Sequence, residues 1–155
     1  MSAEKRATRR TVAFVAAVLL WTAFIWIHST VPGYASTAES DAVVSRLEQF
    51  FIWLGVSDPL TMTLIVRKAA HVSEYALLGF LVCGVVLSLA GRERRRVVLA
   101  GVYLVAVPSI DECIQLFVPG RSGMFTDVLI DLCGIAIGVL VSRLVFRKVA
   151  ADGSD

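Results

Sequence analysis

The sequence predicts an all-α integral membrane protein, in which a four-helix bundle carries one additional amphipathic helix in the membrane interface. Of its 155 residues, 57% are hydrophobic and the mean hydropathy is +0.75, whereas soluble domains contain about 45–50% apolar residues. Four apolar runs have roughly the 20 residues that a helix needs to cross a bilayer. A fifth segment is shorter and mixes apolar with charged residues at helical spacing.

The four spans are expected at residues 11–28, 66–90, 97–117 and 125–146, within a single domain of residues 11–148. Polar tails of residues 1–10 and 149–155 flank this domain. The first span ends at the break His28-Ser29-Thr30-Val31-Pro32-Gly33 because proline and glycine interrupt helices. Residues 35–40 are polar and typical of a loop.

Residues 41–54 form the predicted interfacial helix. Its apolar residues recur at helical spacing and its polar residues occupy the other face: Val43, Val44, Leu47, Phe50, Phe51 and Leu54 against Ser45, Arg46, Glu48 and Gln49. This segment is too short and too charged to span a bilayer, so we expect it to lie in the interface.

The positive charges predict the orientation. Eleven of the 15 Lys and Arg residues fall on one side of the predicted spans, namely Lys5, Arg6, Arg9, Arg10, Arg92, Arg94, Arg95, Arg96, Arg143, Arg147 and Lys148. The other four are Arg46, Arg67, Lys68 and Arg121. Because the positive side faces the cytoplasm, we expect both termini in the cytoplasm and a location in the cytoplasmic membrane.

Ionisable residues in three spans are the main functional signal. Each costs about 2.5–3.5 kcal/mol on insertion scales, yet they gather at one depth, near the outer leaflet. The candidate catalytic residues are His71, Glu74, Asp111, Glu112 and Asp131. The candidate substrate-binding residues are Arg67, Lys68, Tyr75, Gln115, Arg121 and Asp127.

Structural roles compete with these assignments. Arg121 and Asp127 also suit a cap or a surface ion pair, and Arg67 and Lys68 suit interfacial snorkelling. The more deeply placed acids and His71 also suit a neutralised buried network.

Small and acidic residues form a stripe on the fourth span. Asp127, Asp131, Gly134 and Gly138 are spaced to share one helix face. Since Gly-xxx-Gly pairs let helices approach closely, this face should pack against another helix and place Asp131 inside the bundle.

A divalent metal is a candidate cofactor. Its expected ligands are His71, Glu74, Asp111 and Asp131, because histidine and carboxylates from several helices suit such an ion. The three cysteines match no zinc or redox spacing, so no disulfide is expected.

Two long motifs resemble the VanZ-like family of small bacterial membrane proteins, which is named for a teicoplanin-resistance protein. They are KAAHVSEYALLGFL and DECIQLFVPGRSGMFTDVLIDLCGIAIG, and the likeness covers roughly residues 21–146. The family commonly has Asn where this chain has Asp131, which keeps an acceptor and adds a negative charge. The resemblance implies a cell-envelope function at the outer face of the membrane and, for the named member, lower susceptibility to teicoplanin-type glycopeptides.

Three functions are compatible with these features. A binder of a lipid-linked or amphiphilic envelope molecule and a metal-dependent or His-based enzyme on a lipid headgroup are equally favoured. A small proton-coupled transporter is third. The expected partners are membrane lipids or a lipid-linked cell-wall precursor, and no nucleic acid.

Overall fold

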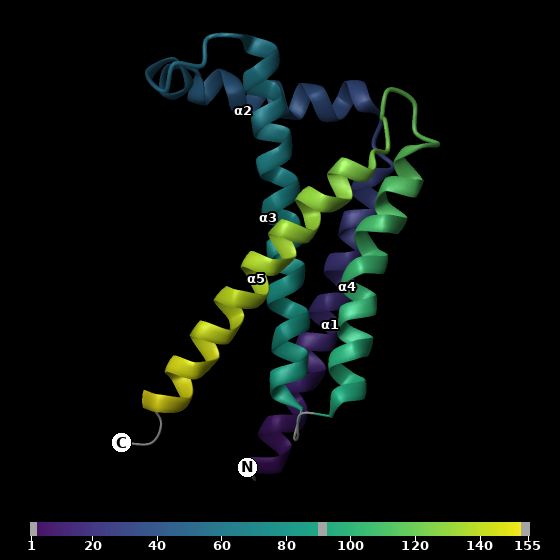
Figure 1. The fold of residues 1–155 in the computed structure, drawn as a ribbon, viewed down its shortest axis with the longest axis vertical. Coiled ribbons are helices and arrows are strands. Elements are labelled where there is room, and N and C mark those ends of the chain that lie inside the picture. The colour runs from purple at the N-terminus through teal and green to yellow at the C-terminus, as the bar shows by residue number, and fades with distance from the viewer. Residues whose placement is uncertain (1–2, 90–92, 153–155) are drawn as a thin grey trace.

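The computed structural model describes residues 3–89 and 93–152, and these residues form five helices and no strand (Figure 1). The helices are α1 (Ala3–Ser29), α2 (Gly33–Trp53), α3 (Pro59–Ser88), α4 (Arg94–Gln115) and α5 (Phe125–Asp152). Four of them contain a segment that is long and apolar enough to cross a membrane. These segments are Thr8–Ser29, Pro59–Ser88, Arg94–Gln115 and Phe125–Arg147. The predicted all-α fold with four spans is confirmed.

The helices form a bundle with a crosswise helix at one end. Helices α1, α3 and α4 contact one another and run along the long axis, while α5 crosses α3 at an incline (Figure 1). Helix α2 lies across this axis at one end of the bundle, which we call the α2 end (Figure 1). The N-terminal part of α1 and the C-terminal part of α5 both lie at the opposite end (Figure 1).

Glycines bring α5 into direct contact with the α3 backbone. A Cβ at Gly138 would lie 1.8 Å from the Ala76 carbonyl oxygen, and one at Gly134 would lie 2.5 Å from that of Val72. No side chain fits in either place. The prediction that this stripe packs against another helix is therefore confirmed, and the partner is α3.

Helix α2 begins earlier than the sequence indicated. Residues 35–40 were expected to be a loop, but α2 begins at Gly33, directly after its N-cap Pro32. Hydroxyl groups in this stretch donate to carbonyl oxygens one turn back: Thr37 Oγ1 to Gly33 at 2.8 Å and Ser40 Oγ to Ser36 at 3.1 Å. The polar residues are therefore accommodated within a helix, and the loop prediction is wrong.

Other helix ends also differ from the predicted spans. Helix α3 begins at Pro59 rather than at residue 66 because Asp58 caps it. Helix α1 begins at Ala3 and α5 continues to Asp152, so both extend into the predicted tails. The remaining tail residues, 1–2 and 153–155, and residues 90–92 between α3 and α4 lie outside the described residues.

Two Val-Pro-Gly turns hold the α2 end together. The Gly33 backbone N–H donates to the Pro119 carbonyl oxygen at 2.9 Å. A Cβ at Gly33 would lie 1.8 Å from the Gly120 carbonyl oxygen, and Gly120 has a positive φ of 75°. The break after α1 is thus joined to the loop between α4 and α5, which carries Arg121.

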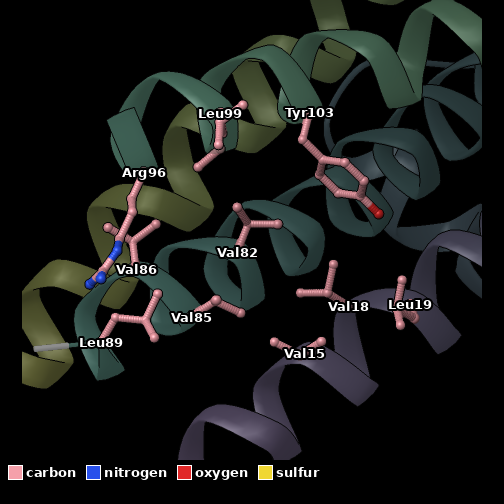
Figure 2. A pocket seen from close by; sticks show the side chains of 11 residues that line it. Val15, Val18, Leu19, Val82, Val85, Val86, Leu89, Arg96, Leu99 and Tyr103 are labelled. Carbon is pink, nitrogen blue, oxygen red and sulfur yellow. The ribbon is translucent and has the colours of Figure 1, made fainter. Parts of the chain in front are cut away.

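An apolar cavity lies in the other half of the bundle. It has a volume of about 290 Å³ and opens between α1, α3 and α4, with Tyr103 and Arg96 as its polar lining residues (Figure 2). Most of its wall is aliphatic, as Val15, Val18 and Val82 illustrate.

Candidate functional site

Polar side chains from α3, α4 and α5 meet inside the bundle near the α2 end. Asp131 is fully buried, and Asp111 and Gln115 each keep only 2% of their surface exposed. Helix α5 brings Asp131 against α3 through the same face that carries the packing glycines. The close contact between these helices therefore determines where the acid lies.

Four of these residues form a group that we call the buried quartet: His71, Asp111, Glu112 and Asp131. One potential ligand atom from each lies within 4.8 Å of those of the other three. His71 Nδ1 lies 3.3 Å from Asp131 Oδ1, but the pair lacks hydrogen-bond geometry. Every member has at least one buried atom without a hydrogen-bond partner in the described part of the chain.

Neighbouring groups orient two of the acids. Gln115 Nε2 donates to Asp111 Oδ2 at 3.2 Å, and the Met124 backbone N–H donates to Glu112 Oε2 at 2.8 Å. In each acid the second oxygen, Oδ1 of Asp111 and Oε1 of Glu112, is buried without a partner among the described residues.

The predicted metal ligands are only partly brought together. His71, Asp111 and Asp131 belong to the buried quartet, but Glu74 does not, and Glu112 takes its place. Glu74 lies one turn after His71 on α3, and its Oε1 is 3.6 Å from Nδ1 of His28 on α1. Glu74 therefore lies outside this group, with its carboxylate beside α1, and its role as a ligand stays a prediction.

A second feature, which we call the polar pocket, opens beside the quartet and has a volume of about 130 Å³. Its lining comes from α1, α2, α3 and the loop after α4: His28, Ser36, Glu39, Ser40, Val43, Val66, Arg67, Ala70, His71, Glu74 and Arg121. His71 belongs to both the pocket and the quartet.

Two guanidinium groups, those of Arg67 and Arg121, line the polar pocket together with the carboxyl groups of Glu39 and Glu74. Arg121 donates from Nε to the Val31 carbonyl oxygen at 3.1 Å and from Nη2 to that of His28 at 3.5 Å. Burial, and then repulsion from Arg67, lower the pKa of Arg121. Arg67 makes no hydrogen bond or ion pair with any residue that the structure describes. Such a pair is well suited to an anion, because guanidinium groups bind phosphate and carboxylate strongly.

The other four predicted binding residues do not line this pocket. Lys68 forms an ion pair with Asp127. A structural ion pair was the alternative to substrate binding for Asp127. Tyr75 has no exposed surface, and Gln115 is buried against Asp111.

Sequence reasoning missed the contribution of α1 and α2. His28 Nε2 lies 3.2 Å from Glu39 Oε2, so this histidine lies between the acids of α2 and α3. The sequence did contain a signal for this role of His28. The residue lies at the end of the first predicted span, at the same expected membrane depth as His71. Ser36, Glu39 and Ser40 share a helix face, but they lie in the stretch that was interpreted as a loop.

Comparison with known proteins supports the resemblance that the two motifs indicate. The family model described as VanZ/LLP1 matches residues 14–146. No curated protein and no solved structure matches the chain. The matched region contains both the buried quartet and the polar pocket. Since it also covers most of the sequence, the chain belongs to the VanZ/LLP1 family of membrane proteins.

Proposed function

We propose that this VanZ-family protein binds the anionic headgroup of a lipid or lipid-linked envelope precursor in the polar pocket. The observation that carries the proposal is Arg67, a cation that lines the pocket and has no partner among the described residues. Arg121 adds a second guanidinium whose position is fixed by backbone carbonyls. An unpaired cation beside another cation is stabilised when a phosphate binds between them.

The size of the pocket favours a headgroup over a whole amphiphile. Pockets for drug-sized ligands measure about 300–1,000 Å³, whereas the polar pocket measures about 130 Å³. Helix α2, which forms one wall, exposes apolar side chains such as Leu47, Phe50 and Trp53. These side chains are suited to contact acyl or prenyl chains while the headgroup enters the pocket.

The charge distribution supports a location at the outer leaflet of the cytoplasmic membrane. The α2 end carries four of the 15 Lys and Arg residues, and the positive-inside rule assigns the poorer side to the exterior. A lipid-linked cell-wall precursor would be accessible there. Its capture would also change susceptibility to teicoplanin-type glycopeptides, which act outside this membrane.

The test compares two arginine substitutions in the full-length protein. Arg67→Gln removes the unpaired pocket cation, and Arg46→Gln is the matched control because Arg46 is exposed on α2 and does not line the pocket. In nanodiscs, retention of a polyprenyl phosphate is measured by native mass spectrometry, with phosphatidylcholine as the competing lipid. Arg67→Gln should lower retention about tenfold or more, which is the effect of losing one charge-assisted contact of about 1.5–3 kcal/mol.

The control should retain the polyprenyl phosphate like the unsubstituted protein. Equal retention by Arg67→Gln and the unsubstituted protein would contradict the proposal. Equal loss in both variants would reduce the effect to nonspecific surface charge and would also contradict it.

Chemistry on the bound headgroup is a second candidate function. The observation that favours it is the position of His71, which lines the pocket and also belongs to the buried quartet. A histidine there could act as a general base that takes a proton from the water attacking the terminal phosphorus of a diphosphate headgroup, with the polyprenyl phosphate as the leaving group. Release of inorganic phosphate from a polyprenyl diphosphate, lost in His71→Asn and kept in Arg46→Gln, would support an enzyme. Absence of release from the unsubstituted protein would exclude this reaction.

A further inference from the structure

We propose that the buried quartet is a binding site for one divalent cation. The four ligand residues are contributed by α3, α4 and α5, so one ion would link three of the membrane-spanning helices. This inference concerns a site beside the polar pocket and does not depend on headgroup binding.

The first argument is charge balance. Three carboxylates converge where little solvent reaches them, and Asp111 and Asp131 are 2% and 0% exposed. Lys68 pairs with Asp127, and Arg121 donates to backbone carbonyls. Arg67 lines the polar pocket and forms no ion pair with these three acids, so His71, 3.3 Å from Asp131, is the one basic side chain of the quartet. Uncompensated charges are strongly destabilising in such surroundings. A bound cation would supply the missing positive charge.

The second argument is the set of unpartnered atoms. In the described part of the chain, His71 Nδ1, both carboxylate oxygens of Asp131 and one oxygen each of Asp111 and Glu112 are buried without a hydrogen bond. Nearly all buried polar atoms in folded proteins have a partner. Coordination to one ion would satisfy atoms from all four residues at once.

The third argument is the support around the ligands. Metal-binding carboxylates are usually held by hydrogen bonds to groups that do not touch the ion. Gln115 holds Asp111 in this way, and the Met124 backbone N–H holds Glu112. Each bond occupies one oxygen and leaves the other for an ion.

The donor set indicates the kind of cation. One imidazole with three carboxylates suits Mn²⁺ or Zn²⁺ better than Mg²⁺, which favours oxygen ligands and bound water. With bonds of about 2.1 Å, ligand atoms are about 3.4 Å apart around a tetrahedral ion and about 4.2 Å apart on opposite sides of an octahedral one. The ligand atoms here lie within 4.8 Å. Side-chain movements that shorten these distances would therefore complete the coordination.

The experiment measures Mn²⁺ binding to the purified full-length protein after treatment with a chelator. Electron paramagnetic resonance and elemental analysis should detect about one Mn²⁺ per chain in the unsubstituted protein. Asp131→Asn and Asp111→Asn should lose this ion. Asp127→Asn is the matched control, because Asp127 lies one turn before Asp131 on α5 but pairs with Lys68. It should keep the ion.

A second measurement separates loss of the ion from loss of the fold. Mn²⁺ should raise the melting temperature of the unsubstituted protein and of Asp127→Asn, because a ligand of the native state stabilises it. In chelator, Asp131→Asn should melt at or above the temperature of the unsubstituted protein, because one of three mutually repelling carboxylates is gone. It should not respond to Mn²⁺.

Gln115→Leu removes the support of Asp111 without removing a ligand. It should weaken Mn²⁺ binding about ten- to a hundredfold. The proposal would be overturned if the unsubstituted protein held neither Mn²⁺ nor Zn²⁺, or if Asp127→Asn and Asp131→Asn bound Mn²⁺ equally. The first result would indicate carboxyl groups that are neutralised without a metal ion, and the second would indicate that Mn²⁺ binds outside the buried quartet. Retention of the polyprenyl phosphate, measured separately, would remain a test of the polar pocket alone.

Discussion

Asp58 is a single residue that determines where a span begins. Its Oδ2 accepts hydrogen bonds from the Thr61 backbone N–H at 2.9 Å and from Thr61 Oγ1 at 2.6 Å. Pro59 follows as the first helical residue, where its missing N–H is harmless. Together these residues start α3 at Pro59, so the helix begins about two turns before the predicted start of the span at residue 66.

Acidification should weaken this cap. The hydrogen bonds from Thr61, first from its side chain and then from its backbone, lower the pKa of Asp58. A lowered folded-state pKa gives stabilisation that is present above the unfolded value of about 3.9 and lost as pH falls through the folded value. Asp58→Asn can still cap but does not titrate. Its melting temperature should therefore be lower than that of the unsubstituted protein near neutral pH, and this difference should disappear in acid.

Melting curves of both proteins across this pH range provide the measurement. A difference that stays constant into acid would show that the charge of Asp58 does not contribute. A Thr61→Val variant, which loses the shorter hydrogen bond, should show a smaller pH dependence than the unsubstituted protein.

Individual contacts in the site were the hardest feature to predict. The polar residues of α3, α4 and α5 were expected at one depth because helical rise relates position in a span to depth. The pairings of Glu74 with His28 and of Lys68 with Asp127 depend on how each helix is rotated about its axis. Sequence spacing gives the faces of one helix but does not say which neighbouring helix each face meets.

At the scale of elements, the contact between α3 and α5 positions the site. The Gly138 position admits no side chain, because a Cβ there would lie 1.8 Å from the Ala76 carbonyl oxygen. Gly138→Ala should therefore destabilise the protein by about 1–3 kcal/mol, the usual effect of overpacking. The matched control is Gly101→Ala on α4, where a Cβ would meet nothing within 4 Å.

The control should be neutral or stabilising, since alanine favours helix by about 1 kcal/mol over glycine. Thermal unfolding in detergent measures both variants. If Gly138→Ala were as stable as Gly101→Ala, the close approach of α5 to α3 would be incorrect. A Gly138→Ala protein that folds with lower stability and no longer binds Mn²⁺ would show that the contact also aligns Asp131 with His71.

Helix α2 shows the limit of prediction for an element. Its apolar second part has a clear helical period, whereas the preceding residues include Ser36, Thr37 and Ser40, which are common in loops. Hydrogen bonds within the helix and burial against the bundle override that preference. The beginning of α2 therefore became evident only with the tertiary contacts. The position of Glu39 in the wall of the polar pocket became evident in the same way.

At the scale of the whole molecule, the number of spans and the charge pattern agree. Four membrane-spanning helices are expected to leave both ends on one side, and the N-terminal part of α1 and the C-terminal part of α5 do lie at the same end of the molecule, opposite α2 (Figure 1). Composition and hydropathy were sufficient to predict this arrangement. The polar pocket could not be predicted in the same way, because four separate segments contribute to it.

Two of the cavities in the described part of the chain differ in character. The polar pocket lies at the α2 end, and the apolar cavity, which is larger than this pocket, lies between α1, α3 and α4 beside Tyr103 (Figure 2). An anionic amphiphile that recognised only apolar surface would favour the larger cavity. One that is recognised by its headgroup should favour the pocket that contains Arg67.

The most direct test is photocrosslinking of a polyprenyl phosphate that carries its photoreactive group beside the phosphate. The full-length protein is irradiated in nanodiscs, and the modified peptides are identified by mass spectrometry. Our account predicts crosslinks within residues 33–43 and 66–74, which line the polar pocket, and their loss in Arg67→Gln but not in Arg46→Gln. Crosslinks confined to residues 82–89 and 96–103, which line the apolar cavity, would contradict it.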